Sequence, residues 1–135
     1  MPFENVVTQQ VLFGSAVRTS TLNSGIFAGS IWRGLTLQMN ITAKGTDLTT
    51  NAGLTFFLQH ADGTGGTIKS INKVPIAGPM KTTGVFLFLY YVGADINETD
   101  YSQVIRAPLP AKFRFRIQAG DATPFTYSAT VFYLP

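Results

Sequence analysis

The chain has 135 residues and a formal net charge of +3, and 45% of its residues are hydrophobic, 13% aromatic and only 13% charged. A chain of this length is expected to fold as one domain that buries about two thirds of its unfolded surface, without a disulfide or metal to hold it together. It contains no cysteine, which excludes disulfides, thiolate metal sites and cysteine nucleophiles, and its single histidine leaves little material for acid–base chemistry.

No targeting or membrane signal is recognisable in the sequence. Residues 1–5 lack the basic and apolar regions of a signal peptide. The longest uncharged apolar run, residues 85–92, is too short to cross a membrane. We therefore expect a soluble, unsecreted protein without membrane attachment. Residues 1–8 lack strand periodicity and are predicted to form an extended N-terminal arm, followed by one domain over residues 9–135.

Apolar and polar residues alternate along the first half of the chain, which is the pattern of strands with one buried face. Residues 10–19 are predicted to supply a strand. The alternation from 35 to 43 is unbroken and predicts the strongest strand of the chain. Residues 54–61 and 67–77 are weaker strand candidates.

The second half continues the pattern with one exception. Residues 85–92 are apolar throughout, which favours a central strand covered on both faces. A single helical turn is predicted within 97–104, and alternating strands follow at 112–119 and 125–134. We predict an all-β chain folded as a single antiparallel β-sandwich, jelly-roll-like, of about seven or eight strands. The turns that separate the strands are rich in Gly, Asn, Asp and Pro and lie at 44–47, 62–66, 78–79 and 120–124.

The sequence offers few residue arrangements that could serve catalysis. His60 is the only histidine available to a Ser-His-Asp arrangement, and it falls at the end of a predicted strand beside a turn. The run Asp62-Gly63-Thr64-Gly65 resembles an aspartic-protease motif, but the inserted glycine breaks it, and the glycines fit a hairpin turn. We therefore predict that the chain is not an enzyme and carries no cofactor.

One acidic segment has part of the sequence pattern of a calcium-binding loop. Oxygen-bearing side chains recur at alternate positions from Asp95, as they do in an EF-hand. The sixth position is Asp100 instead of glycine and the twelfth is Arg106 instead of glutamate, which excludes that motif. A looser cation site using Asp95, Glu98 and Asp100 stays open beside the simpler interpretation of a solvated loop, and no bound metal is predicted.

A row of three cations is the sharpest surface feature. Lys112, Arg114 and Arg116 occupy alternate positions and therefore share one face of a predicted strand. One interpretation is a solvated edge strand protected by charge against aggregation. The other is a docking stripe for an acidic protein surface. Direct nucleic-acid binding is not expected, because the ten cationic residues are scattered and interleaved with seven acids.

Four further residues are candidates for contacts with another chain. Trp32 and Arg33 precede the strongest predicted strand, and these residue types concentrate at interface hot spots. A tryptophan at the edge of the core is the alternative for Trp32. Phe3 and Phe27 lie in segments without strand periodicity and could make apolar contacts with a partner.

Several short segments follow one another in a characteristic order and spacing, within a stretch that covers residues 18–134. They are RTSTLNS (18–24), WRGL (32–35), QHAD (59–62), GVF (84–86) leading to YVGA (91–94), LPAKFR (109–114) and TPFTYS (123–128). This ordered set resembles a group of small virion proteins of tailed bacteriophages, generally described as head decoration or minor structural proteins. The chain departs from the group at Phe113, where members often have tryptophan, and at Asp62-Gly63, where they often have an Asp-Pro turn.

The resemblance implies a non-enzymatic protein on the outer surface of a phage head. It would bind the major capsid protein in the assembled lattice and stabilise the shell, as a homo-oligomer with a trimer favoured. The predicted N-terminal arm would lie along the capsid or add a strand to a neighbour. A tail or neck component is one alternative. A carbohydrate-binding module is another, and it would need exposed aromatics on one concave face, such as Trp32, Tyr90, Tyr91 and Tyr101.

Overall fold

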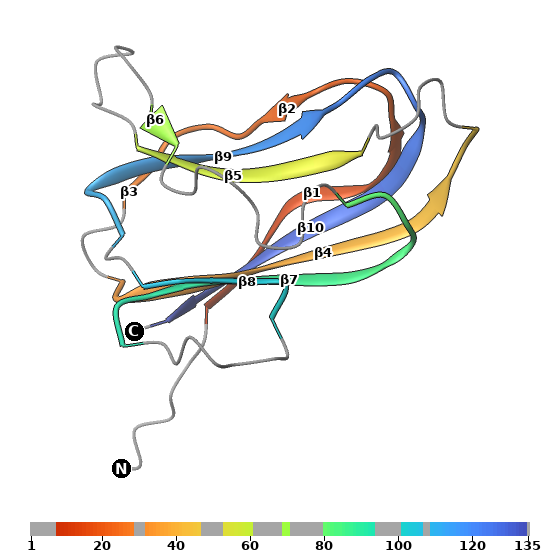
Figure 1. Ribbon diagram of the computed structural model, residues 1–135. Coiled ribbons are helices and arrows are strands. Elements are labelled where there is room, and N and C mark those ends of the chain that lie inside the picture. The colour runs from red at the N-terminus through yellow and green to blue at the C-terminus, as the bar shows by residue number, and fades with distance from the viewer. Residues whose placement is uncertain are drawn as a thin grey trace.

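The computed structural model describes residues 8–28, 32–46, 53–60, 69–70, 80–93, 101–106 and 109–134. Within these residues the chain forms ten β-strands and no helix, arranged in two layers (Figure 1). The all-β prediction is confirmed. The strands are β1 (Thr8–Arg18), β2 (Leu22–Asn23), β3 (Phe27–Ala28), β4 (Gly34–Lys44), β5 (Leu54–His60), β6 (Lys69–Ser70), β7 (Gly84–Tyr91), β8 (Gln103–Ile105), β9 (Lys112–Ala119) and β10 (Phe125–Leu134).

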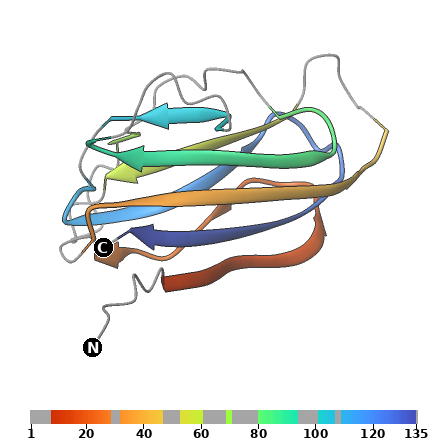
Figure 2. The same ribbon diagram turned by 90° about the horizontal axis from the view of Figure 1, so that it is seen from below.

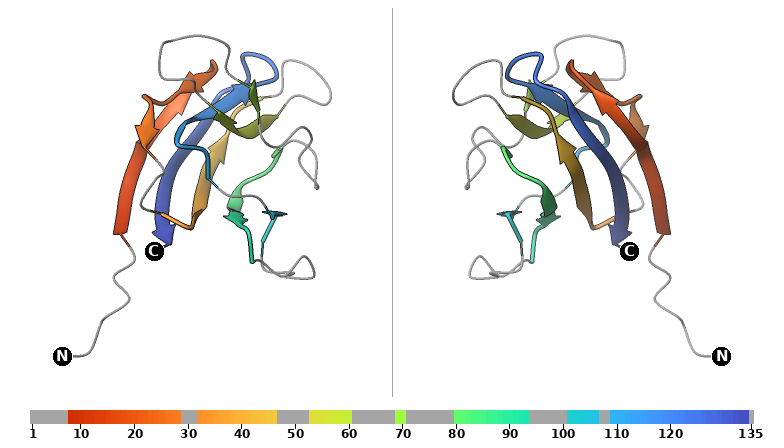
Figure 3. Two further views of the ribbon diagram at one scale, coloured as in Figure 1. Left: turned by 90° about the vertical axis from the view of Figure 1, so that its left-hand side faces the viewer. Right: turned by 90° about the vertical axis from the view of Figure 1, so that its right-hand side faces the viewer.

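The two layers are β-sheets packed face to face. Sheet A has the strand order β1-β10-β4-β7-β8, and its strands lie side by side in Figure 3. Sheet B has the order β2-β9-β5-β6, and β3 also pairs with β9. Every pair is antiparallel except β7 and β8, which run parallel. The β-sandwich prediction is confirmed, and the jelly-roll connectivity stays a prediction.

The chain crosses repeatedly from one sheet to the other. It leaves β1 in sheet A for β2 and β3 in sheet B, and returns to sheet A for β4. It then forms β5 and β6 in sheet B, β7 and β8 in sheet A, β9 in sheet B and β10 in sheet A. Sheet A is the layer nearer the viewer in Figure 2. Neighbouring strands are therefore often far apart in the sequence, and their pairing depends on non-local contacts.

The strongest alternating segments become the interior strands of the two sheets. In β4 the residues Leu35, Leu37 and Met39 have no exposed surface, while the residues between them are partly exposed. Strand β10 follows the same pattern over its whole length, and β9 buries every second residue from Phe113 to Ile117. Because successive side chains of a strand point to opposite faces, each of these strands supplies one wall of the core.

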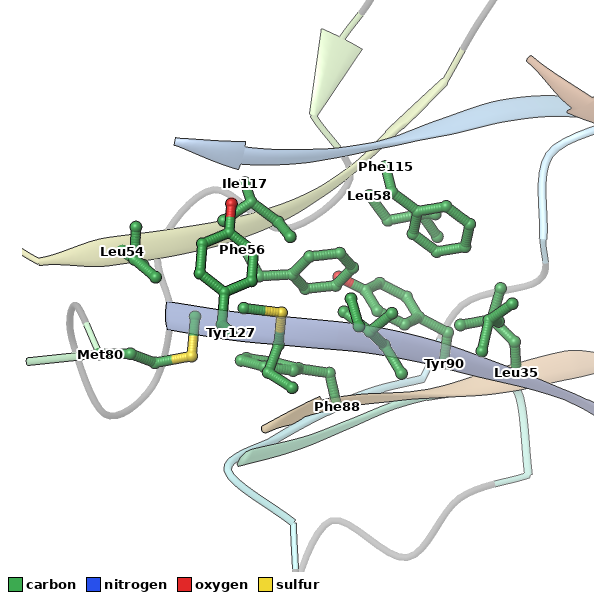
Figure 4. Close-up of a cluster of buried hydrophobic side chains, with 14 of the residues drawn as sticks. Leu35, Leu54, Phe56, Leu58, Met80, Phe88, Tyr90, Phe115, Ile117 and Tyr127 are labelled. Atoms are coloured by element: carbon green, nitrogen blue, oxygen red, sulfur yellow. The ribbon is translucent and has the colours of Figure 1, made fainter. Parts of the chain in front are cut away.

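Aromatic rings join the two sheets across the core (Figure 4). The centroid of the Phe56 ring, from β5, lies 4.9 Å from that of Phe88 and 6.1 Å from that of Tyr90, both from β7. Within sheet B it lies 5.9 Å from Phe115 of β9. Fully burying a side chain of this size contributes about 1.5–3 kcal/mol, so these rings are a major part of what holds the sandwich together.

Three expectations concern segments that the structure describes only in part. The helical turn expected within 97–104 is absent from its described part, where Tyr101 and Ser102 form a bend and β8 begins at Gln103. Of the strand expected at 67–77, only β6 lies within the described residues. Residues 1–7 of the expected N-terminal arm lie outside them, and Thr8 already belongs to β1, where it pairs with Tyr133.

Candidate interaction surfaces

The candidate chemical groups of the sequence are few in the described residues. Among them, no group of three or more His, Cys, Asp or Glu side chains could hold a metal ion. The looser cation site expected at Asp95, Glu98 and Asp100 lies outside the described residues. His60 is exposed at the last position of β5, opposite Phe113 of β9, as its sequence position predicts. In the part of the chain that the structure describes, no helix is long and apolar enough to cross a membrane.

The outer face of sheet B carries the three cations predicted from the sequence. Lys112, Arg114 and Arg116, here called the basic row, alternate along β9 with the fully buried Phe113 and Phe115. Lys112 is exposed, and both arginines are partly exposed. Strand β9 lies between β5 and the β2/β3 edge, so the interpretation of a charged edge strand is wrong. The edge interpretation failed because a single strand pattern does not reveal which strands pair beside it.

Neighbouring strands hold the two arginines in place. Arg114 donates a hydrogen bond from Nε to Oε1 of Gln59 on β5, at 2.7 Å. Arg116 donates from Nη1 to Oδ1 of Asn23 on β2, at 3.5 Å. Both acceptors are neutral amide groups, so they orient the guanidinium groups without cancelling their charge. Sequence reasoning missed Gln59 and Asn23, although Gln59 occupies an outward position in the alternation of its own strand.

The outer face of sheet A has the opposite character. The pairing register places on it a set of outward residues that includes no Lys, Arg, Asp or Glu, here called the neutral face. Val11, Val17 and Val85 are 60%, 66% and 57% exposed, which is high for branched apolar side chains. The neutral face consists of Gln9, Val11, Val17, Thr36, Gln38, Asn40, Val85, Leu87, Tyr91, Val104, Thr126, Ser128, Thr130, Phe132 and Leu134. Leu89 points to the same side but is buried.

The other predicted contact residues have different environments. The Trp32 ring stacks on Tyr133 with centroids 5.1 Å apart, so this tryptophan lies at the edge of the core. Arg33 is exposed, and its backbone N–H donates to the Leu134 carbonyl at 2.9 Å. The Phe27 ring packs on Phe113 and Phe115 of its own chain, with centroids 5.9 and 5.8 Å away. Phe3 lies outside the described residues.

Arg18 joins the end of β1 to β10, and no sequence pattern predicted this contact. Its guanidinium donates to the carbonyl oxygens of Tyr127 and Gly14, both at 2.6 Å. It also lies 4.7 Å from the centroid of the Tyr127 ring, within the range of a cation–π interaction. These contacts fix the end of β1, where the register of its pairing with β10 shifts between Phe13 and Ala16.

Two buried tyrosines of sheet A, one on β7 and one on β10, point toward sheet B but differ in their hydroxyl groups. Burial raises the pKa of Tyr90 well above its usual value, and a hydrogen bond with the Leu58 backbone partly offsets this. Burial also raises the pKa of Tyr127, and the Arg18 charge partly offsets that increase. The Tyr127 hydroxyl points toward Ile117 of sheet B (Figure 4), and it has no hydrogen-bond partner among the described residues. The Tyr90 hydroxyl is therefore hydrogen-bonded across the core to sheet B, whereas the Tyr127 hydroxyl makes no such bond with a described residue.

These observations define a class of protein: a β-sandwich whose two described outer sheet faces differ in charge. No family model, curated protein or solved structure matches the chain. The phage resemblance therefore rests on the ordered segments of the sequence alone.

Proposed function

We propose that this chain is a non-enzymatic structural protein of a tailed-phage virion that binds the assembled head and stabilises the lattice of the major capsid protein. The neutral face is the observation that carries the proposal. Protein interfaces differ from the remaining surface mainly by having few charges in their centre, and this face has none among its described residues. Its exposed valines supply apolar surface that a partner would remove from water.

The ordered sequence segments that resemble head decoration proteins support the same proposal. A decoration protein acts by mass action, because it binds only the assembled lattice and so lowers the free energy of that state. Self-association around a local symmetry axis, with a trimer favoured, would multiply weak contacts into avidity.

Counting copies of the chain in purified particles of the phage that encodes it tests this proposal. Quantitative mass spectrometry should find hundreds of copies per particle, bound on the outer surface of the head. A few copies per particle would instead assign the chain to the tail or neck. Complete absence from particles would overturn the virion proposal.

Variants of the neutral face then test the docking surface itself. Val11→Lys and Val85→Lys change two exposed side chains on different strands of that face, so both variants are expected to fold. Each should weaken binding to heads that lack the chain by about tenfold or more, because an unpaired charge would be buried in the interface. Gln118→Lys adds the same charge at an exposed position of β9 and is the matched control. Equal weakening by all three variants would contradict a docking role for the neutral face.

The packing of two aromatic side chains weighs against the carbohydrate-binding alternative. It required a set of exposed aromatic side chains on one face. Tyr90 is only 1% exposed and points into the core, and Trp32 is stacked on Tyr133. Two of its four proposed aromatics are therefore committed to packing within the chain.

A further inference from the structure

We propose that the basic row is a docking surface for an acidic polypeptide segment in extended conformation, with carboxylates at alternate positions. The inference rests on the geometry of sheet B and is independent of the virion proposal. It would hold for any partner that presents such a segment.

The spacing of the row determines what fits it. Lys112, Arg114 and Arg116 occupy every second position of one strand, so neighbouring cations are separated by about 7 Å along β9. An extended peptide repeats its side chains on one face at the same interval. A segment with Glu or Asp at alternate positions can therefore match the row in register.

The arginines are already oriented for such a partner. Gln59 accepts a hydrogen bond from Nε of Arg114. Among the described residues, no contact engages the terminal Nη groups of Arg114. Asn23 accepts from one Nη of Arg116. A guanidinium group fixed in this way loses little conformational freedom when it binds a carboxylate, and it can donate two parallel hydrogen bonds.

The charge of the row is not neutralised by the described part of the chain. Asp121 is the only carboxylate among the described residues, and none of the three cations forms an ion pair with it. The other outward residues around the row are neutral: Asn23, Thr55, Phe57, Gln59 and Gln118. Three like charges in one line on a background that is neutral in the described residues favour an anionic partner.

A polypeptide fits these features better than a nucleic acid does. Single-stranded nucleic acids are bound by broad basic grooves with exposed aromatic platforms for the bases. The described outer face of sheet B has a single file of cations, and Phe57, its one aromatic residue there, is only partly exposed. The bidentate geometry of the arginines also suits planar carboxylates.

The test uses a short synthetic peptide with glutamate at every second position and threonine between. Its binding to the full chain is measured by fluorescence anisotropy at low salt and mapped by amide chemical-shift changes. The controls are a peptide of the same composition with consecutive glutamates and a single-stranded oligothymidylate of equal charge. We expect the alternating peptide to bind most tightly, with shifts confined to β9, β5 and β2.

Substitutions in the row sharpen the result. Arg114→Gln and Arg116→Gln should each weaken the alternating peptide about fivefold, as expected for partly solvated ion pairs. Lys112→Gln, at an exposed position that cannot disturb folding, should weaken it less. Arg106→Gln removes an equal charge from an exposed position beside β8 and should have little effect. The proposal is overturned by equal losses in the Arg106 variant, by preference for consecutive glutamates, by tighter binding of the oligonucleotide, or by no binding at all.

Discussion

Sheet A and sheet B bury the same kind of side chains and expose different ones. Both inner faces are aliphatic and aromatic, and they meet in one core. The described outer face of sheet A has no charged residue, whereas three cations stand in line on the outer face of sheet B. The inner residues are fixed by the need to pack, and the outer residues are free to serve recognition. We therefore expect stability to depend on the core, and we propose that the two outer faces bind partners.

Removal of a core ring should destabilise both sheets together, and we expect it to lower the free energy of unfolding more than any other substitution. Phe56 is fully buried between the sheets, so Phe56→Ala should lower the free energy of unfolding by about 3–5 kcal/mol. Phe57→Ala changes the next residue, which points outward from the same strand and is only partly exposed. Chemical denaturation should show a clearly smaller loss for this matched variant. Similar losses for the two would contradict the assignment of inner and outer faces.

A glycine at the start of β4 tests the close packing within sheet A. A Cβ atom added at Gly34 would overlap the Tyr90 carbonyl oxygen, and only a movement of the backbone could relieve this contact. Gly34→Ala should therefore cost about 1–3 kcal/mol of unfolding free energy. At Gly25 the added atom would meet nothing within 4 Å. Thermal unfolding of Gly25→Ala should stay close to the parent, and an equally large loss there would contradict the steric explanation.

Alkaline pH should weaken the core that the two faces share. Burial raises the pKa of Tyr90, Tyr127 and Tyr133, so the folded state favours their neutral forms. A raised folded-state pKa leaves stability complete below the unfolded value, near pH 10, and removes it as the pH rises toward the folded value. Denaturation midpoints should be level on the neutral side of about pH 10 and fall above it. Tyr90→Phe should flatten this fall most, and an unchanged slope would contradict the role of Tyr90.

Removing the hydroxyl group alone should separate the two inward tyrosines at neutral pH. Tyr90→Phe loses the hydrogen bond with the Leu58 backbone and should cost about 1 kcal/mol. Tyr127→Phe removes a buried hydroxyl that has no partner, so its free energy of unfolding should be unchanged or higher. Urea denaturation of the two single variants provides the comparison. A larger loss in the Tyr127 variant would show that its hydroxyl has a partner in solution.

The sequence predicted the inner faces well because alternation is a local property. The segment 35–43 needed no knowledge of its neighbours, and it lies within β4 with its apolar residues buried as far as Ile41. Ala43 is exposed, because the pairing with β10 shifts register at this end of the strand. The position of β9 inside its sheet depends on β2, β3 and β5, which approach it from distant parts of the chain. The Gln59 contact to Arg114 joins residues 55 positions apart, so no local pattern could have revealed it. The sequence analysis also did not predict β8, because its parallel pairing with β7 is not visible in a local pattern.

The smallest expected effect concerns the basic row, and it distinguishes binding from stability most directly. Arg114 and Arg116 are partly solvated and bonded only to neutral amides, so Arg114→Gln and Arg116→Gln should each change the free energy of unfolding by less than about 1 kcal/mol. Like charges about 7 Å apart repel, and salt screens that repulsion. The parent chain should therefore gain more stability from added salt than either variant does. A loss of several kcal/mol on substitution would mean that the row serves the fold, and the contrast between a structural core and recognition faces would fail at this strand.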